Sequence, residues 1–366
     1  MTPANRLRFR ILAVLSSGAF LFPFASCSGS SESTAALTPS STMCSGGQSA
    51  VTCWSPGETH FNVGNVPPDA MVMTPTPEFD ANRCQVQAQV SDGCCNGAVT
   101  GPELKDGKCC YGFCTGACCG RPLFVAGEAL VAGVIRRDDW LDPTVLASIA
   151  TTADAAERAH LADAWLEDAR MEHASIASFA RFVLDLLAFG APADLVEQAS
   201  KAMDDEIRHA RACFAIATAY SGVARGPGPL PLAGVIPSAT LAEAASAAFR
   251  EGCVGETIAA LTLSRQASTA RSPVLRSLLE AIADDEARHA ELAWKFVRWA
   301  LASGDADVRV AIADALRSAG SHVGPASSIA AAREHGRLAP GDFEQVRLEA
   351  WQKVIGPCAR ALDRAA

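Results

Sequence analysis

The sequence feature that most constrains this chain is a seven-residue motif that occurs twice. Residues 204–210 and 284–290 agree at six of seven positions and share the pattern Asp-Asp-Glu-x-Arg-His-Ala. In each copy a glutamate stands three residues before a histidine, and residues three apart lie on one face of a helix. A carboxylate and an imidazole placed in this way can bind one metal ion together. The repeat therefore predicts two matching half-sites, each on a helix.

Both copies lie in long segments that have the apolar periodicity of helices. These segments span 154–189, 192–220, 238–269 and 272–302, and the third is capped by Ser238 or Thr240. The first two are joined tightly, as are the last two. Residues 221–237 hold four Gly and four Pro and cannot be a helix interior. The sequence thus predicts an all-α fold of two helical hairpins joined by a long crossover.

A repeated hairpin predicts one further ligand in the first helix of each pair. Glu172 stands 34 residues before Glu206, and Glu256 stands 30 residues before Glu286. Each lies within an apolar stripe, where a carboxylate is costly unless it is paired or bound to metal. Four carboxylates and two imidazoles compose a dinuclear metal site, predicted to be Glu172, Glu206, His209, Glu256, Glu286 and His289.

These residues resemble the pattern of the ferritin-like di-iron carboxylate superfamily, in which two helices each give a Glu and two each give Glu-x-x-His. The resemblance covers about residues 154–302 and fills all six positions. It implies a ferritin-like four-helix bundle with two iron ions, although the ligands also suit manganese or a mixed pair. It also implies that Asp205 is hydrogen-bonded to His289, and Asp285 to His209. The alternative is that both Asp are ordinary acids of the helix surface.

The activity implied by the resemblance is an O₂-dependent oxidation at two Fe(II) ions. Radical generation is disfavoured because the two tyrosines are Tyr111 and Tyr220, the latter three turns past His209. Storage in a closed shell fits poorly with a lipid anchor and a Cys-rich module. We expect a ferroxidase acting on Fe(II), or a small oxidase or oxygenase with an organic substrate. The alternative is a non-catalytic structural or metal-binding lipoprotein of the cell envelope.

Several residues near the motif are not predicted to be ligands. Glu157 and His160 form a third Glu-x-x-His, but no Asp pair precedes them, so they are interpreted as a solvated helix end. His173 is the neighbour of a predicted ligand and points about 100° away from it, so a surface or helix-contact role is predicted. Arg208 and Arg288 either anchor the two motif Asp residues or face water.

Eleven of the fourteen cysteines fall within residues 27–119. Such a cluster is typical either of a disulfide framework in a secreted protein or of a zinc or rubredoxin-type centre. A centre of that kind needs Cys-x₂-Cys pairs, and the sequence has none. We therefore expect disulfides of unspecified connectivity among Cys44, Cys53, Cys84, Cys94, Cys95, Cys109, Cys110, Cys114, Cys118 and Cys119.

Three cysteines lie outside that cluster. Cys213 and Cys253 each stand within about one turn of a predicted ligand. They are interpreted either as small core residues or as a disulfide that joins the second and third helices. Acylation of Cys27 leaves an odd number of cysteines, so at least one is unpaired or bonded to another chain, and Cys358 is the candidate.

The N-terminus has the pattern of a signal peptide. Three Arg residues lie within the first ten positions, and residues 11–24 are apolar. Residues 24–27 resemble a bacterial lipobox in which Cys27 is acylated after cleavage, although Phe24 stands where Leu is usual. The alternative is a secretory signal cut near Ala25. Both place the protein outside the cytoplasm, as a membrane-anchored lipoprotein (outer membrane or periplasmic face) or as a secreted protein.

The predicted organisation has six parts. A signal segment (1–27) and a disordered Ser/Thr-rich tether (28–50) precede the Cys-rich module (51–120) and a connector (121–153). The bundle (154–302) is followed by a C-terminal region (303–366) with amphipathic helices at 305–320 and 340–363. The net charge is −9 and no basic patch stands out beyond the first ten residues, so nucleic acid is not an expected partner.

Overall fold

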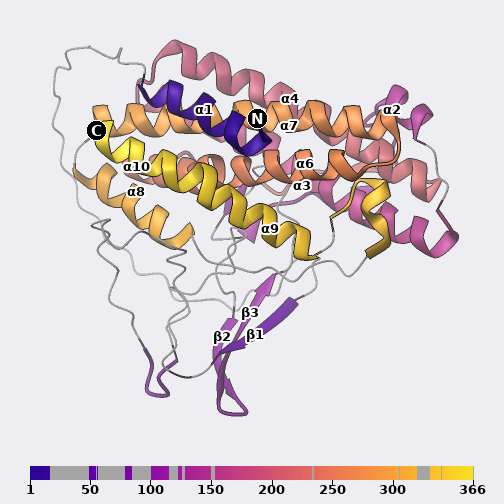
Figure 1. Ribbon diagram of the computed structural model, residues 1–366, viewed down its shortest axis with the longest axis horizontal. Helices are drawn as coiled ribbons and strands as arrows, with labels where there is room; N and C mark the ends of the chain where they lie inside the picture. The colour runs from indigo at the N-terminus through magenta and orange to yellow at the C-terminus, as the bar shows by residue number, and fades with distance from the viewer. Residues whose placement is uncertain are drawn as a thin grey trace.

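The structure is a computed structural model that describes residues 1–16, 49–54, 56, 79–84, 100–114, 123–125, 128–149, 153–232, 235–304, 306–319, 330–338 and 340–365. The described part is mostly helical with little sheet, in agreement with the predicted all-α class (Figure 1). Residues 28–48 of the predicted tether, whose last two residues belong to a strand, and Cys27 lie outside the described residues.

The first hairpin consists of α3 (Ala155–Ala188) and α4 (Ala193–Ser221), which pack along their length. The carboxylate of Asp154 caps α3 by accepting hydrogen bonds from backbone N–H groups of the first turn. The turn between the helices contains Gly190, whose φ of 67° lies in the left-handed region that glycine adopts without strain. Gly222 ends α4 in the same way. These bounds match the predicted segments 154–189 and 192–220.

The third predicted helix is not one continuous α-helix. It divides into α5 (Leu241–Ala247), a π-helical segment η2 (Ala248–Glu256) and α6 (Thr257–Thr269). Thr240 caps it, whereas Ser238 binds the carboxylate of Asp185. Glu251 and Glu256 are both buried although they stand five residues apart. Hydrogen bonds in a π-helix join residues five apart, and this wider turn lets both side chains face the interior.

The fourth predicted helix is α7 (Pro273–Ser303), capped by Ser272 and with Pro273 in its first turn, where proline is tolerated. The C-terminal region contains α8 (Ala306–Ala319), the 3₁₀ segment η3 (Ala330–His335) and α9 (Pro340–Ala350). A second π-helical segment, η4 (Trp351–Ile355), leads into α10 (Gly356–Ala365). The predicted helix at 340–363 is therefore present in three pieces.

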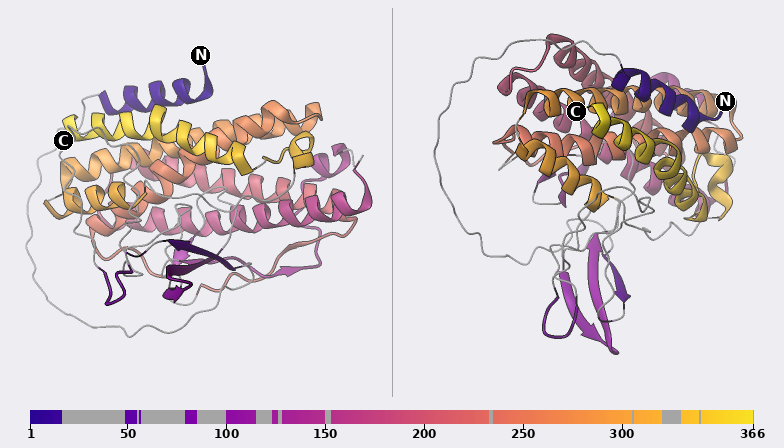
Figure 2. Two further views of the ribbon diagram at one scale, coloured as in Figure 1. Left: turned by 60° about the horizontal axis from the view of Figure 1, so that its bottom comes forward. Right: turned by 60° about the vertical axis from the view of Figure 1, so that its left-hand side comes forward.

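The N-terminal helix α1 (Pro3–Ser16) packs against α7, η4 and α10 (Figure 2). It buries one face and leaves Phe9 exposed on the other. Arg10 forms an ion pair with Glu291 of α7, and Arg298 donates a hydrogen bond to the Val14 carbonyl. Among the described residues, no helix combines the length and apolar character needed to cross a membrane. The buried face consists of Ala4, Leu7, Ile11 and Leu15.

A small antiparallel sheet forms the described part of the Cys-rich module (Figure 1). Its order is β1 (Ser49–Trp54), β3 (Lys108–Cys114), β2 (Thr100–Lys105). Asp106 and Gly107 both have positive φ values, as a tight hairpin turn between β2 and β3 requires. The remaining short elements are β4 (Phe124–Val125), β5 (Glu128–Ala129), α2 (Pro143–Ser148), and β6 (Val134–Ile135) paired with β7 (Gly226–Pro227).

One disulfide of the module joins Cys84 to Cys109, and Cys110 is also disulfide-bonded. Disulfide formation agrees with the predicted use of these cysteines. Cys53 and Cys114 lie on β1 and β3. The other predicted disulfide residues lie outside the described part of the chain: Cys44, Cys94, Cys95, Cys118 and Cys119.

The helical part has two apolar clusters. One contains Phe179, Phe249 and Phe296 and extends to α1 and α10. The other contains Trp165 and Phe214 and lies toward the opposite ends of α3 and α4. Along α3, α4 and α7, the boundary between the two clusters falls at Glu172, at Glu206 and at Glu286. In the third helical segment, Glu256 lies within the first cluster. The candidate site is therefore enclosed by apolar side chains.

Candidate metal centre

All six predicted ligands are buried and converge between the helices. Each of the four long helical segments contributes at least one of them, and Glu256 is the last residue of η2. The side chains of Glu206, Glu256 and Glu286 have no exposed surface at all. Such burial is unusual for carboxylates and requires compensation by a counter-charge. The set comprises Glu172 on α3, Glu206 and His209 on α4, Glu256 on η2, and Glu286 and His289 on α7.

The ligand atoms fall into two overlapping groups. Within each group, one atom from each of four residues lies within 4.8 Å of the others, a spacing that can hold a metal ion. Both groups use Glu206 and Glu286. The first group adds Glu172 and His209, and the second adds Glu256 and His289. Two carboxylates are thus shared, while one further carboxylate and one imidazole belong to each group alone.

Many polar atoms of the cluster have no hydrogen bond among the described residues. Both carboxylate oxygens of Glu206 and of Glu256 lack a hydrogen bond, and so does the Nδ1 atom of His209. One oxygen each of Glu172 and Glu286 completes the set. A buried polar atom without a partner costs on the order of 1–3 kcal/mol, more if it is charged. Unpartnered donor atoms that all face one small region fit the requirements of bound cations.

The imidazoles point their Nδ1 atoms at these carboxylates. His209 Nδ1 lies 3.3 Å from Glu286 Oε1 and 3.7 Å from both Glu172 Oε2 and Glu206 Oε2. His289 Nδ1 lies 3.1 Å from Glu206 Oε1 and 3.2 Å from Glu286 Oε2. Each imidazole therefore faces both shared carboxylates through the same ring atom.

Burial and these contacts shift the pKa values in a regular pattern. Burial raises the pKa of all four glutamates, and it leaves the pKa of Glu172 and Glu256 well above the ordinary range. At Glu206 and Glu286 the contacts with the imidazoles outweigh burial, and the pKa falls below that range. Without a metal ion, Glu172 and Glu256 therefore bind a proton more strongly than an ordinary glutamate, and Glu206 and Glu286 bind one less strongly.

The pKa values of the two histidines are shifted as well. Burial alone would lower the pKa of His209 and His289, but carboxylates surround both rings and hold each pKa well above its usual value. Protons on the imidazoles therefore help to balance the charge of the carboxylates in the metal-free cluster.

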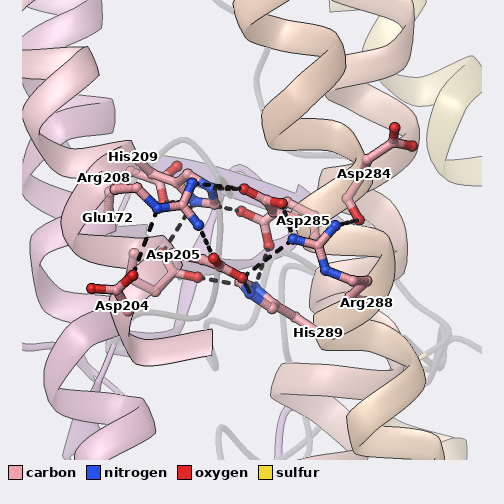
Figure 3. A network of polar contacts seen from close by, with 11 residues as sticks. Glu172, Asp204, Asp205, Arg208, His209, Asp284, Asp285, Arg288 and His289 are labelled. Atoms are coloured by element: carbon pink, nitrogen blue, oxygen red, sulfur yellow. Dashed lines mark hydrogen bonds and ion pairs between the residues drawn. The ribbon is translucent and has the colours of Figure 1, made fainter. Parts of the chain in front are cut away.

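Behind the imidazoles, the two motif aspartates cross between the halves (Figure 3). His209 Nε2 lies 3.1 Å from Asp285 Oδ2, and His289 Nε2 lies 3.1 Å from Asp205 Oδ2. These are the two pairings that the resemblance implies. A carboxylate at Nε2 favours the proton on that nitrogen, which leaves Nδ1 as the ligand atom.

Two arginines close the aspartates into a ring (Figure 3). Arg208 contacts Asp205 of its own helix and reaches Asp285 across the interface at 3.4 Å. Arg288 contacts Asp285 and lies 3.6 Å from Asp205. The guanidinium groups remain about half exposed. Of the two roles open from the sequence, the arginines anchor the aspartates and also contact water.

The residues excluded from the prediction lie outside both metal-holding groups. His160 is exposed, and Glu157 contacts His335 rather than the ligand cluster. His173 is partly buried and makes an edge contact with the ring of Trp140 at 5.0 Å. Burial lowers the pKa of His173. It therefore packs against the segment that precedes α2.

The three cysteines of the helical region are buried. Cys213 is a free thiol, so the disulfide between the second and third helices is not formed, and Cys213 and Cys253 are small core residues. Cys358, the candidate for an unpaired cysteine, is also a free thiol. Burial raises the pKa of Cys213 well above its usual value and that of Cys358 to about 12.

Sequence reasoning missed two buried ion pairs that flank the cluster. Asp168, one turn before Glu172, pairs with Arg337. Glu251, one π-turn before Glu256, pairs with Arg181 at 3.2 Å. The two pairs occupy corresponding places in the two halves. The two acids interrupt apolar stripes, and this could have marked them as buried and paired. Their partners could not be identified, because they lie in distant segments of the chain.

Comparisons with known protein families, with curated proteins and with solved structures find no match to this chain.

Proposed function

We propose that the buried cluster holds two divalent metal ions, which we assign as iron, and that the protein is an oxidoreductase using O₂. The observation that carries this proposal is the pair of overlapping donor groups that share Glu206 and Glu286. Four carboxylates carry four negative charges, and two divalent ions neutralise them fully. With one ion bound, protons would have to balance the charge of the other group.

The choice of iron and of a ferritin-like four-helix bundle rests on the resemblance to the di-iron carboxylate superfamily. Its support is the arrangement of donors, one Glu from each of two helices and Glu-x-x-His from each of the other two. The packing of α3 with α4 and of α6 with α7 supports it further. Carboxylate and imidazole donors also suit manganese, so the metal is an explicit object of the test.

When bound, two iron ions supply one-electron steps and a binding place for O₂. The protein supplies the rest of the chemistry. Glu206 and Glu286 would contact both ions, and Asp205 and Asp285 fix the imidazoles in one tautomer. The apolar clusters on both sides exclude bulk water. The electron donor is Fe(II) itself for a ferroxidase, or a small organic molecule for an oxidase or oxygenase.

The location outside the cytoplasm is part of the same proposal. It rests on the basic start of the chain, the apolar run and the residues around Cys27. Acylation of Cys27 would tether the helical domain to a membrane surface through the Ser/Thr-rich segment. Labelling with a radioactive fatty acid, in the native chain and in Cys27→Ser, tests the anchor. Equal labelling of both would refute it.

Metal analysis of the purified chain tests the centre directly. We expect about two ions per chain. Glu206→Gln removes a shared donor and should abolish binding of both ions, whereas Glu256→Gln should spare the first group and retain about one. Glu157→Gln is the matched control, because it alters the Glu-x-x-His outside the cluster. Metal content that is equal in Glu206→Gln and Glu157→Gln would refute the site.

Oxygen consumption tests the reaction. The protein loaded anaerobically with Fe(II) should consume O₂ and develop the absorption of oxo-bridged iron. Continued turnover of added Fe(II) without an organic substrate identifies a ferroxidase. A single oxidation followed by arrest identifies an enzyme that needs an organic reductant. Binding of two metal ions with no O₂ reactivity would support the non-catalytic alternative.

A further inference from the structure

The π-helical segment η2 is contacted from the other hairpin at one of its buried acids. Arg181 of α3 has its Nη2 atom 3.2 Å from each of the two carboxylate oxygens of Glu251. About one turn earlier on α3, the hydroxyl of Ser178 donates a hydrogen bond to Glu251 Oε2 at 3.4 Å. Because α3 belongs to the first hairpin and η2 to the second, these contacts join the two halves of the helical region.

The contacts to Glu251 lie inside the protein. The side chain of Arg181 is 15% exposed and that of Glu251 is 9% exposed, while Ser178 has no exposed surface. In such surroundings a charge-assisted contact is stronger than at the surface, where water and salt screen it. The side chain of Glu251 is therefore held in one direction, toward α3.

The direction of Glu251 matters for Glu256, because both side chains belong to η2 and both face the interior. In an α-helix, residues five apart point about 140° away from each other. With Glu256 at the metal cluster, an α-helical segment would turn Glu251 away from α3 and lose the contact. The wider turn of a π-helix permits both positions at once. The contact between Arg181 and Glu251 thus stabilises the π-helical form relative to the α-helical one.

The buried ion pair in the other half provides a comparison. Asp168 pairs with Arg337 and stands one turn before Glu172. Asp168 and Glu172 both belong to α3, a regular α-helix that packs along α4. Residues four apart share one face of an α-helix without help from another segment. Loss of the pair between Asp168 and Arg337 should therefore leave Glu172 in place.

We propose that Arg181 is a positioning residue, which acts through Glu251 to keep η2 in the π-helical form that places Glu256 at the second metal-holding group. The part of this inference that concerns metal rests on the proposed function, whereas the effect on η2 does not depend on metal. The two ions then differ in what supports them. The ion of the second group depends on an ion pair between the hairpins, and the ion of the first group does not.

Two double variants of the full-length chain test the proposal, and each removes one buried ion pair without changing the net charge. One combines Arg181→Met with Glu251→Gln, and its matched control combines Asp168→Asn with Arg337→Met. Neither leaves an unpaired buried charge, so both should fold, as circular dichroism will check. After removal of metal by a chelator, amide hydrogen exchange across 248–256 should become about tenfold faster in the first variant, because the segment opens more easily. It should stay unchanged in the control.

Titration with Mn(II), followed by electron paramagnetic resonance of the free ion, gives the second readout. The first double variant should bind one ion like the native chain and the other about 10–100-fold more weakly, the scale expected when a residue that orients a ligand is lost. The control should bind both ions like the native chain. Arg181→Lys keeps the charge and should lie between the native chain and the first double variant in both readouts. This milder change decides the question if the double variant does not fold.

Unchanged exchange across 248–256 in the first double variant, or equal changes in the two double variants, would overturn the proposal. Unchanged affinity for both ions in the first double variant would overturn it as well. A native chain that binds no Mn(II) would instead contradict the proposed metal centre. Hydrogen exchange in the metal-free chain would still decide the role of Arg181.

Discussion

At the scale of single residues, Asp205 and Asp285 connect the two halves of the candidate site. Each accepts from the histidine of the other half and is held by two arginines. The ring has approximate two-fold symmetry because the two motif copies are nearly identical. Its function is to keep both Nδ1 atoms directed at the shared carboxylates, which an isolated histidine would not maintain.

Replacing Asp285 by Asn tests this role. The amide no longer carries the charge that favours the proton on His209 Nε2, so the ring loses its preferred tautomer. We expect metal affinity at the first group to fall about 10–100-fold. Asp284→Asn is the matched control, because its side chain is exposed on the same helix. Titration with Fe(II) or Mn(II) measures both, and similar affinities would contradict the assigned role.

The shifted pKa values predict how metal binding depends on pH. The pKa values of His209, His289, Glu172 and Glu256 are raised, so in the metal-free chain these groups keep their protons to higher pH than usual. A metal ion must displace those protons, so affinity should rise with pH and binding should release protons. Calorimetry in buffers of different ionisation enthalpy measures the number released. Release of no protons at pH 7 would contradict the prediction.

The ligand residues could be grouped from sequence because the motif repeats and both partner glutamates interrupt apolar stripes. The six residues grouped in this way are the six that lie together. The hydrogen bond between the Tyr220 hydroxyl and His335 Nδ1, 2.9 Å long, could not be predicted, because 115 residues separate the two and neither belongs to a repeated pattern. Similarly, nothing in the sequence joins Asp168 to Arg337. Long-range contacts of single residues leave no periodic signal.

At the scale of elements, η2 determines where Glu256 points. Caps and glycine stops set the ends of α3, α4 and α7, which is why those bounds could be predicted closely. The π-helix could not be predicted, because a single added residue hardly disturbs the apolar periodicity of a long helix. Its consequence is local but decisive, because one added residue turns the side chains that follow by about 100° around the helix axis.

Deletion of Gly252 tests the role of the π-helix. The shorter segment should relax to an α-helix. Glu256 should then rotate relative to Glu251, so that the two side chains cannot face inward at the same time. We expect the second group to lose its ion while helical content measured by circular dichroism stays nearly constant. Deletion of Ile236, exposed in the crossover, is the control and should retain both ions. Equal metal content in the two deletions would contradict this account.

At the scale of the whole molecule, α1 connects the beginning of the chain to its end. It packs on α7 and α10, and it covers the surface on which Cys358 is buried. The segment predicted to direct export thus forms part of the apolar core in the uncleaved chain. Its removal would expose apolar residues of η4 and α10.

A pair of alanine substitutions measures how firmly α1 is docked. Ile11 has no exposed surface, so Ile11→Ala in the full-length chain should lower the free energy of unfolding by about 2 kcal/mol or more. Phe9 is 69% exposed on the same helix, and Phe9→Ala should change it by less than about 0.5 kcal/mol. Denaturant unfolding compares the two. Equal effects would show that α1 does not pack on the core.

The sharing of Glu206 and Glu286 has a consequence for assembly. Each donor group takes three residues from one hairpin and a single glutamate from the other. Neither hairpin can complete a group alone, so a bound ion would cross-link the two hairpins. Anything that binds only the assembled state stabilises it in proportion to the logarithm of its concentration. The concentration of free metal ions would then determine how stable the association of the two hairpins is, as well as whether the centre can react.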